Sequence, residues 1–370
     1  MTTQPDFRLF VDKEIMPHSD QFDREERIPP ELIKTLFDKG YIAGFISPEY
    51  GGAGMDMTTY GLLCEQIGRG NASLLSLFTV HGMVSYVLLK WGTKEQNTRW
   101  LPRLASGEII SAFGLTEPNI GTDARHIETE ARATEKGYIL NGKKKWTSFG
   151  QIADLFLILA LCEGKPAAFF VPRETEGFSI KPMSGLLGFR SAQLAELQFE
   201  NCLIPKGNLV GRIGFGFSHI AGTALDHGRF CIGWGCTGLA QACLDASLKY
   251  SSERKQFGSF LKEHQLIQRF IADMVVRVKA ARLLCQRAAE LQESGDPELI
   301  METSIAKYFA STAAMQSALD AVQIHGANGC CDQYPVQRYL RDAKIMEIIE
   351  GSSQIQQIII SRYAHQFELI

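Results

Sequence analysis

The chain has 370 residues, of which 45% are hydrophobic and 21% are charged, and its formal net charge is -3. This length exceeds the size at which one hydrophobic core usually keeps growing, so we expect two or three packed domains. Because the charges are well mixed, the sequence has neither the basic stripe of a nucleic-acid-binding protein nor the polybasic patch of a membrane-surface protein.

The first 110 residues have a helical pattern. Pro30 opens an amphipathic segment that Gly40 closes, and a second apolar-periodic stretch covers residues 83–91. From residue 111 onward the apolar period shifts to two, with Lys-Gly, Asn-Gly and Glu-Gly pairs that we expect to form turns. We therefore expect an N-terminal helical domain over residues 1–110 and a central β-domain over residues 111–222.

Long helical patterns return after residue 223. They cover residues 239–250, 264–291 and 302–324, each bounded by Gly, Pro or Asp. We expect residues 223–370 to form a C-terminal helical domain. No internal repeat or low-complexity linker separates the three parts, so we expect them to pack as one body.

The nine cysteines are odd in number, lie mostly in apolar surroundings and include no Cys-x-x-Cys pair. We expect buried thiols, with no disulfide framework and no metal site. No apolar run reaches the length expected of a membrane span, and the N-terminus lacks a signal-peptide pattern. A cytoplasmic protein is the simplest expectation.

Residues 346–356 (MEIIEGSSQIQ) present one carboxylate, Glu350, in a Gly-Ser loop between two apolar segments. Ser353 and Gln356 fit a capping box for the helix that follows. Partial desolvation should raise the pKa of a carboxyl placed there toward the range useful to a general base. An acidic residue ahead of a helix is also a favourable partner of the helix dipole, so the pattern alone leaves both roles open.

Two segments of the β-domain are richer than a core requires. Residues 113–123 (FGLTEPNIGTD) end a strand with Pro and Gly, where backbone N–H groups become free to contact a ligand. Trp146 and Ser148 lie two residues apart and should face the same side of a strand, an arrangement that suits a flat heterocycle. A plain turn explains the first segment equally simply, and a Trp-Ser pair on a strand is more often ordinary packing.

These segments occur in an order typical of one flavoprotein family. They are PEYGGAGM at 48–55, VHG at 80–82, GTKEQ and LPRLASGE within 92–108, GLTEPNIGTD at 114–123, KKWTSFG at 144–150, GFRSAQLAELQFENCLIP at 188–205, SERKQFG at 252–258, EHQ at 263–265, DAVQIHGANG at 320–329 and RDAKIMEIIEGSSQIQ at 341–356. Over nearly all of its length, the chain resembles the acyl-CoA dehydrogenases. The resemblance implies an α+β fold: an N-terminal α-helical domain, a central β-barrel domain and a C-terminal four-helix bundle.

The resemblance also implies FAD as the cofactor. Residues expected to line or contact the flavin from the same chain are Phe113, Leu115, Thr116, Gly121, Thr122, Trp146 and Ser148. Residues expected to contact the FAD of a neighbouring subunit are Arg254, Phe257, Gln265, Gln323, Gly326 and Ala327. Ser352 and Gln354 would meet the adenine half or the pyrophosphate. A homodimer or homotetramer is therefore expected.

Glu350 matches the family's catalytic carboxylate, which removes the α-proton of an acyl thioester while flavin N5 accepts a hydride from Cβ. The family has a second possible place for this base, and the matching residue here is Gly228, which cannot take a proton. Thr122, Asp226 and Arg229 match positions that meet the thioester's pantetheine and nucleotide arm.

Departures from the family pattern bear on the substrate. Ile120 and His126 stand where the family usually has small residues, and they are expected to narrow or reshape the thioester channel. Residues 230–238 (FCIGWGCTG) and 344–353 (KIMEIIEGSS) look closer to dehydrogenases of hydroxymalonyl-type and methoxymalonyl-type extender units held on an acyl carrier protein. The leading expectation is therefore a small acyl group on a carrier protein in polyketide or nonribosomal peptide biosynthesis.

Three alternatives stay open. The first is the same chemistry on a short or branched acyl-CoA. The second, a flavin monooxygenase on the same scaffold, generally dispenses with the carboxylate base and is disfavoured by Glu350. The third, a helical scaffold without activity, has no need of Glu350, Arg254 and Trp146 together. The sequence leaves the electron acceptor open.

Overall fold

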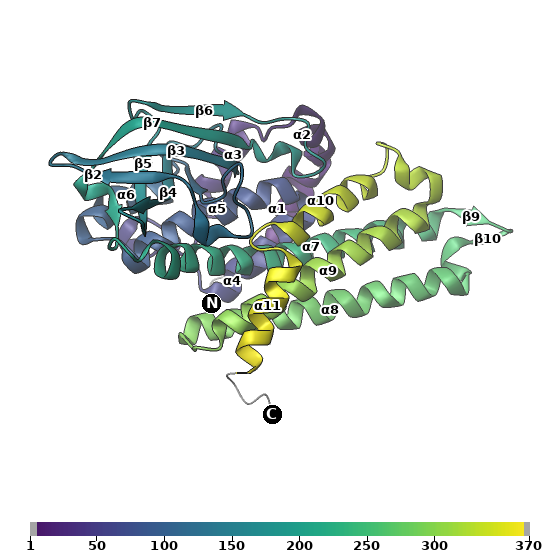
Figure 1. Cartoon of the computed structure of the whole chain (residues 1–370). Helices are drawn as coiled ribbons and strands as arrows, with labels where there is room; N and C mark the ends of the chain where they lie inside the picture. The colour runs from purple at the N-terminus through teal and green to yellow at the C-terminus, as the bar shows by residue number, and fades with distance from the viewer. Residues whose placement is uncertain (1–5, 366–370) are drawn as a thin grey trace.

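The computed structural model describes residues 6–365 and has three parts in chain order: helices, a β-sheet and helices again (Figure 1). This agrees with the expected fold class. The N-terminal helices are α1 (Phe7–Glu14), α2 (Ser19–Glu25), α3 (Pro30–Asp38), α4 (Met57–Gly70), α5 (Ala72–Trp91) and α6 (Lys94–Ser106).

Side-chain caps fix the starts of the central N-terminal helices. Asp56 accepts from the backbone N–H of Thr59 at the start of α4, and Asn71 accepts from that of Leu74 at the start of α5. Both satisfy backbone donors that a helix start leaves unpaired. Helix α5 begins at Ala72, eleven residues before the stretch recognised from its period, because it is apolar on all faces rather than on one.

Helix α5 also corrects the expectation about apolar runs. Its 20 residues have a mean hydropathy of 1.7 and pass a length-and-composition test for a membrane span, the one helix in residues 6–365 to do so. Inside the protein, however, 89% of this window is buried. α5 is therefore a core helix, which passes the same test as a span.

The β-domain contains β1 (Ser111–Gly114), β2 (Glu130–Ala133), β3 (Gly137–Thr147), β4 (Leu155–Cys162), β5 (Lys165–Pro172), β6 (Phe178–Pro182), β7 (Ala195–Pro205) and β8 (Leu209–Val210). Hydrogen bonding orders the strands β6-β7-β3-β2-β4-β5-β8, and β1 pairs in parallel with β4. The Lys-Gly and Glu-Gly pairs do lie where a strand begins or ends. Asn141-Gly142 does not form a turn, because both residues lie within β3, where the register shifts at a bulge.

The end of β3 also differs from expectation. Between Lys144 and Thr147 the pairing with β7 shifts register, and Trp146 has a left-handed φ of 63°. Alternation of faces fails across such an irregularity, and Ser148 lies beyond the strand. The prediction that Trp146 and Ser148 share a strand face is therefore wrong.

The C-terminal helices are α7 (Gly222–Glu253), α8 (Gln265–Ser294), α9 (Leu299–His325), α10 (Val336–Ile348) and α11 (Ser353–Ala364). Helix α7 begins 17 residues before the predicted stretch, because its buried residues surround it and leave no one-sided pattern. It packs tightly on α4: a Cβ added to Gly68 would lie 2.5 Å from the Gly235 Cα. On α7 the same contact requires glycine at Gly238, where an added Cβ would lie 1.9 Å from the Glu65 carbonyl oxygen of α4.

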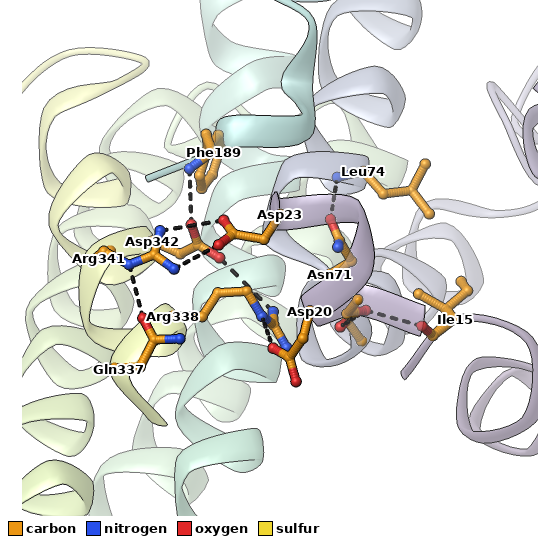
Figure 2. Close-up of polar contacts among 12 residues, drawn as sticks. Ile15, Asp20, Asp23, Asn71, Leu74, Phe189, Gln337, Arg338, Arg341 and Asp342 are labelled. Atoms are coloured by element: carbon orange, nitrogen blue, oxygen red, sulfur yellow. Dashed lines mark hydrogen bonds and ion pairs between the residues drawn. The ribbon is translucent and has the colours of Figure 1, made fainter. Parts of the chain in front are cut away.

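A buried ionic network joins the first and last helical parts (Figure 2). The guanidinium of Arg341 in α10 donates to both carboxylate oxygens of Asp23 in α2, and Arg338 Nε donates to Asp20 at 2.8 Å. Asp342 accepts from the backbone N–H of Phe189, in the loop before β7, at 2.8 Å. Burial raises the pKa of Asp342 to about 6, against the opposing effect of Arg338. Helix α10 is thus fastened to both other parts.

Substituting Arg338 tests this network. In Arg338→Met the fully buried Asp342 and the half-exposed Asp20 lose their cation, and we expect the free energy of unfolding at pH 7 to fall by roughly 3 kcal/mol. Lys34→Met, which breaks the exposed pair with Asp38, is the control and should change it by less than about 0.5 kcal/mol. Equal shifts in urea unfolding of the two variants would contradict the assignment.

Candidate active site

Glu350 lies in the short connection between α10 and α11. Its φ is 55° and that of Gly351 is 89°, so two consecutive residues are left-handed. This conformation costs a non-glycine residue about 1 kcal/mol or more, and it persists where surrounding contacts impose it. Here the contacts are made to the backbone carbonyls of Glu350 and Gly351.

Three buried donors from three helices hold these carbonyls. Arg229 Nε of α7 donates to the Glu350 carbonyl at 3.2 Å. Gln356 Nε2 of α11 donates to the carbonyls of Glu350 and Gly351, at 3.1 and 3.0 Å. Lys307 Nζ of α9 donates to the Gly351 carbonyl at 2.8 Å. The loop is therefore fixed by its backbone.

The predicted capping box is wrong. Ser352, not Ser353, is the N-cap residue of α11, and no side chain caps the helix there. The buried hydroxyl of Ser353 has no hydrogen-bond partner, and Gln356 reaches the two carbonyls described above instead of the N-cap N–H. The box fails because the helix starts one residue earlier than expected and the Gln356 amide donates to these carbonyls, leaving its Oε1 without a partner.

The carboxylate of Glu350 is left free. Within residues 6–365 it has no ion pair within 4.0 Å and no hydrogen bond. It faces α7 at Gly228, where an added Cβ would lie 2.6 Å from Glu350 Oε2 and would also overlap the Met83 methyl group. Burial raises the pKa of Glu350 to about 7, although Arg229 and Lys307 oppose the rise. Such a carboxylate exchanges protons at neutral pH.

The Glu350 backbone N–H is free as well: it donates to no protein group in the described part of the chain. An unpaired donor beside an unpaired carboxylate is rare inside a protein. The two groups can act together on a ligand, one as acceptor and the other as donor.

A cavity of about 440 Å³ lies between α5, α7 and the α8–α9 turn. Asp226 lines it and accepts from Arg229 Nη1 at 2.8 Å, so the cavity adjoins the arginine that holds Glu350. Three of its lining residues have buried polar atoms without partners: His227 Nδ1, Gln292 Oε1 and Thr303 Oγ1. Unpaired polar atoms in three residues that line one cavity favour a polar ligand.

The β-domain residues meet where β1 and β3 end. The backbone N–H of Lys145 donates to the Thr116 carbonyl at 2.8 Å, which brings residues 113–116 next to Trp146. The Trp146 side chain is 50% exposed, and Phe113, Thr116 and Ser148 are half-buried. Leu115 is buried, and Gly121 and Thr122 lie on the exposed loop that follows. Exposure of a large indole at an irregular strand end marks a surface suited to an aromatic ligand.

A third set of predicted residues lies at the far end of the helical bundle. The hairpin β9 (Lys255–Gln256) and β10 (Ser259–Phe260) projects there, away from the β-domain (Figure 1). Phe257 at its tip is 98% exposed. All six residues predicted to contact a neighbouring subunit's FAD are exposed: Arg254, Phe257, Gln265, Gln323, Gly326 and Ala327. One chain alone does not bring them to Glu350 or Trp146, so their contact with a neighbouring subunit's cofactor stays a prediction.

Family models match the three parts of the chain: the acyl-CoA dehydrogenase N-terminal domain at residues 2–108, the middle domain at 112–202 and the C-terminal domain at 214–365. An acyl-CoA dehydrogenase of Bacillus subtilis is 39% identical over 362 residues, 96% of this chain and 95% of that protein. The chain belongs to the acyl-CoA dehydrogenase family. It is an oxidoreductase acting on CH–CH bonds.

Solved structures of acyl-CoA dehydrogenases and their relatives share the fold. Butyryl-CoA dehydrogenase from Megasphaera elsdenii superposes with a TM-score of 0.94 at 32% identity, covering 99% of this chain and 98% of that one. FkbI, from biosynthesis of a methoxymalonyl extender unit, has a TM-score of 0.90 at 28% identity, with 98% of each chain covered. The prolyl acyl carrier protein oxidase AnaB has a TM-score of 0.92 at 29% identity, covering 98% and 99%.

FAD is the cofactor of this dehydrogenase family, and the residues present fit it. A second cavity, of about 320 Å³, opens at the N-terminus of α11 and is lined by Ser352, Ser353 and Gln354. Free N–H groups of a helix start, with the orphaned Ser353 hydroxyl, suit a phosphate. The exposed indole of Trp146 suits the flat ring. Both ends of a flavin dinucleotide thus have matching groups in this dehydrogenase.

The sequence analysis did not single out Lys307 or Met83, and it did not predict the carbonyl contacts of Gln356. Lys307 left a signal, since it interrupts the apolar pattern of α9 at a buried position. Gln356 was noticed but given the wrong partner. Met83 carries no signal of its own, because a methionine on an apolar helix is ordinary core.

The raised pKa of Glu350 predicts a stability change. Its carboxyl binds a proton more tightly in the folded state, so its ionisation destabilises the fold as pH rises from about 4.5 to about 7. At pH 8, the free energy of unfolding of Glu350→Gln should therefore exceed that of wild type by at most about 3 kcal/mol, as measured by urea unfolding. The difference should vanish near pH 4.5. A difference independent of pH, at fixed protein and FAD concentration, would show that the carboxyl is not desolvated.

Proposed function

We propose that this protein is an FAD-dependent dehydrogenase of a short acyl-CoA and that Glu350 is its catalytic base. The observation that carries the proposal is the Glu350 carboxylate: it is unpaired, has a pKa of about 7 and sits on a loop whose carbonyls are anchored. Gly228 across from it cannot take a proton, so no second base competes at that position.

The residues account for the proton transfer. The carboxylate of Glu350 takes the α-proton of the thioester, and the electron pair of that C–H bond forms the new double bond. The free Glu350 N–H donates to the thioester carbonyl oxygen, where negative charge develops. Bound FAD supplies the acceptor of the hydride that leaves Cβ. Arg229, Gln356 and Lys307 keep the base in place without neutralising it.

Packing beyond the base supports a short acyl group. Met83 lies against Gly228, and Leu75 fills the space over Gly235, two turns further along α7. Side chains packed to interior density leave little room for a long alkyl chain along this helix. Similarity to butyryl-CoA dehydrogenase agrees with this limit.

A second candidate is the same reaction on an acyl group held by a carrier protein. The cavity that Asp226 lines also has Asp296 but only one lysine, Lys90, in its lining, so it is poor in cations for the phosphates of CoA. FkbI and AnaB, which are similar over nearly the whole chain, support this candidate in polyketide or nonribosomal peptide biosynthesis. The curated relatives favour the acyl-CoA substrate.

Two residues expected to reshape the thioester channel do not distinguish an acyl-CoA substrate from a carrier-protein substrate. Ile120 is half-buried against a hydrophobic cluster. His126 is exposed, with Nδ1 2.8 Å from Asp123 Oδ1. Roles for Thr122 and for the cofactor-contacting residues remain part of the proposal.

The base is tested by Glu350→Gln. It should keep FAD bound while lowering anaerobic flavin reduction at saturating substrate by several orders of magnitude, because a transition-state interaction is lost. Glu302→Gln is a matched control, since Glu302 on α9 is another partly buried carboxyl with a raised pKa. Reduction within about tenfold of wild type in Glu350→Gln would reject the assignment.

The carrier is tested by presenting one short acyl group on CoA and on an acyl carrier protein. If the substrate is an acyl-CoA, reduction with the CoA thioester should be at least as fast. A carrier-protein advantage of roughly tenfold, or about 1.4 kcal/mol, that shrinks as salt rises would favour the second candidate. The measurement is kcat/KM for flavin reduction at two ionic strengths.

A further inference from the structure

Lys307 is a buried cation without a carboxylate partner. Its side chain is fully buried in α9, where α7 packs over it at Gly233. Within residues 6–365 no Asp or Glu oxygen lies within 4.0 Å of Nζ, whose acceptors are the carbonyls of Gly351 at 2.8 Å and Glu347 at 3.5 Å. Burying an unpaired ammonium costs several kcal/mol, so its placement needs a compensating interaction.

Lys144 is also fully buried, but its contacts differ from those of Lys307. Lys144 in β3 lies 2.6 Å from the Glu117 carboxylate, an ordinary buried ion pair. Burial lowers the pKa of each lysine to about 8. Lys307 instead makes its shorter hydrogen bond to the carbonyl of Gly351, the residue next to Glu350.

We propose that Lys307 is a positioning residue for Glu350: it fixes the left-handed Gly351 through its carbonyl, and its charge favours the ionised form of the base. The inference rests on the proposed function, since it concerns the same base. Lys307 acts on the base through the Gly351 carbonyl and through its charge, not through contact with substrate or cofactor.

Other charged groups around Glu350 do not supply this effect. Arg229 of α7 also lowers the pKa of Glu350, but its charge is shared with Asp226 at 2.8 Å. Glu347 of α10 is paired with Lys344 at 2.9 Å. The buried Cys231 thiol of α7, its pKa raised by burial, is neutral. On α11, Tyr363 lies near the Asp226–Arg229 pair.

Lys307 is therefore the cation near Glu350 that no carboxylate within ion-pair distance offsets in the described part of the chain. Removing its charge should raise the pKa of Glu350 further, because burial would then be opposed by Arg229 alone. Since the base works ionised, the rising limb of the rate profile should move to higher pH.

The test uses FAD-loaded Lys307→Met and Lys307→Gln. The first removes charge and donor, and the second removes the charge but keeps a donor for the Gly351 carbonyl. In both, the rising limb of anaerobic flavin reduction should move up by about one pH unit or more. At alkaline pH, the plateau rate of Lys307→Gln should be higher than that of Lys307→Met. Lys307→Arg, which keeps the charge, should have the rising limb at the wild-type pH.

A readout independent of turnover is the carboxyl region of an infrared titration, with Glu350→Gln as the blank. The Glu350 carboxyl should titrate at higher pH in both uncharged variants. Arg282→Met, which strips the buried Glu65 of its cation far from the base, is the control for lost stability and should leave the limb in place.

Unchanged carboxyl titration in both uncharged variants would overturn the role of Lys307 while leaving Glu350 as base. Full activity in Glu350→Gln would instead overturn the proposed function, whatever the lysine variants do. Failure of all three Lys307 variants to fold would make Lys307 a residue of the fold alone and would also overturn the inference.

Discussion

The site depends on one constraint: the donors around the Glu350 loop bind its backbone carbonyls and leave its carboxylate alone. Arg229 and Gln356 both reach the Glu350 carbonyl, although a carboxylate is the stronger acceptor. Hydrogen bonds to an ionised carboxylate lower its pKa and remove its use as a base at neutral pH. Hydrogen bonds to the carbonyls instead fix the position of the Glu350 carboxylate and leave its oxygens without a hydrogen-bond donor.

Helix α7 makes this arrangement possible. Gly228 on one face leaves room for the carboxylate, while Arg229, the next residue, reaches around to hold the loop. The same helix uses Gly238 to approach α4. Glycines weaken an isolated helix, so α7 is held by tertiary packing on several sides rather than by propensity. Its glycines serve both the site and the core.

Much of the fold could be predicted from local pattern. Helix α3 has its start and stop residues in the expected places, and β4 and β5 read as apolar runs ended by turn residues. The ends of α5 and α7 could not be predicted, because helices buried on all sides show no period. The bulge in β3 was hidden by Asn-Gly, a pair typical of turns that also tolerates an irregular strand.

The site could be predicted in part. An isolated acid in a Gly-Ser loop, together with the family resemblance, singled out Glu350. Its free carboxylate and its three anchors depend on helices far apart in the chain, and no local pattern records such contacts. Lys307 shows the limit: a charge at a buried position signals a tertiary partner, but the partner here is a backbone carbonyl without any side-chain signature.

The ionic network between α2 and α10 has a consequence for biosynthesis. Asp20 and Asp23 meet Arg338 and Arg341 across 318 residues of intervening chain. At roughly 5–20 residues per second, the ribosome takes a quarter of a minute to a minute to make that stretch. During that time the first helices expose the surface that α10 later covers. In nascent chains of this protein, the carboxylates of α2 should therefore lack their arginine partners until synthesis is almost complete.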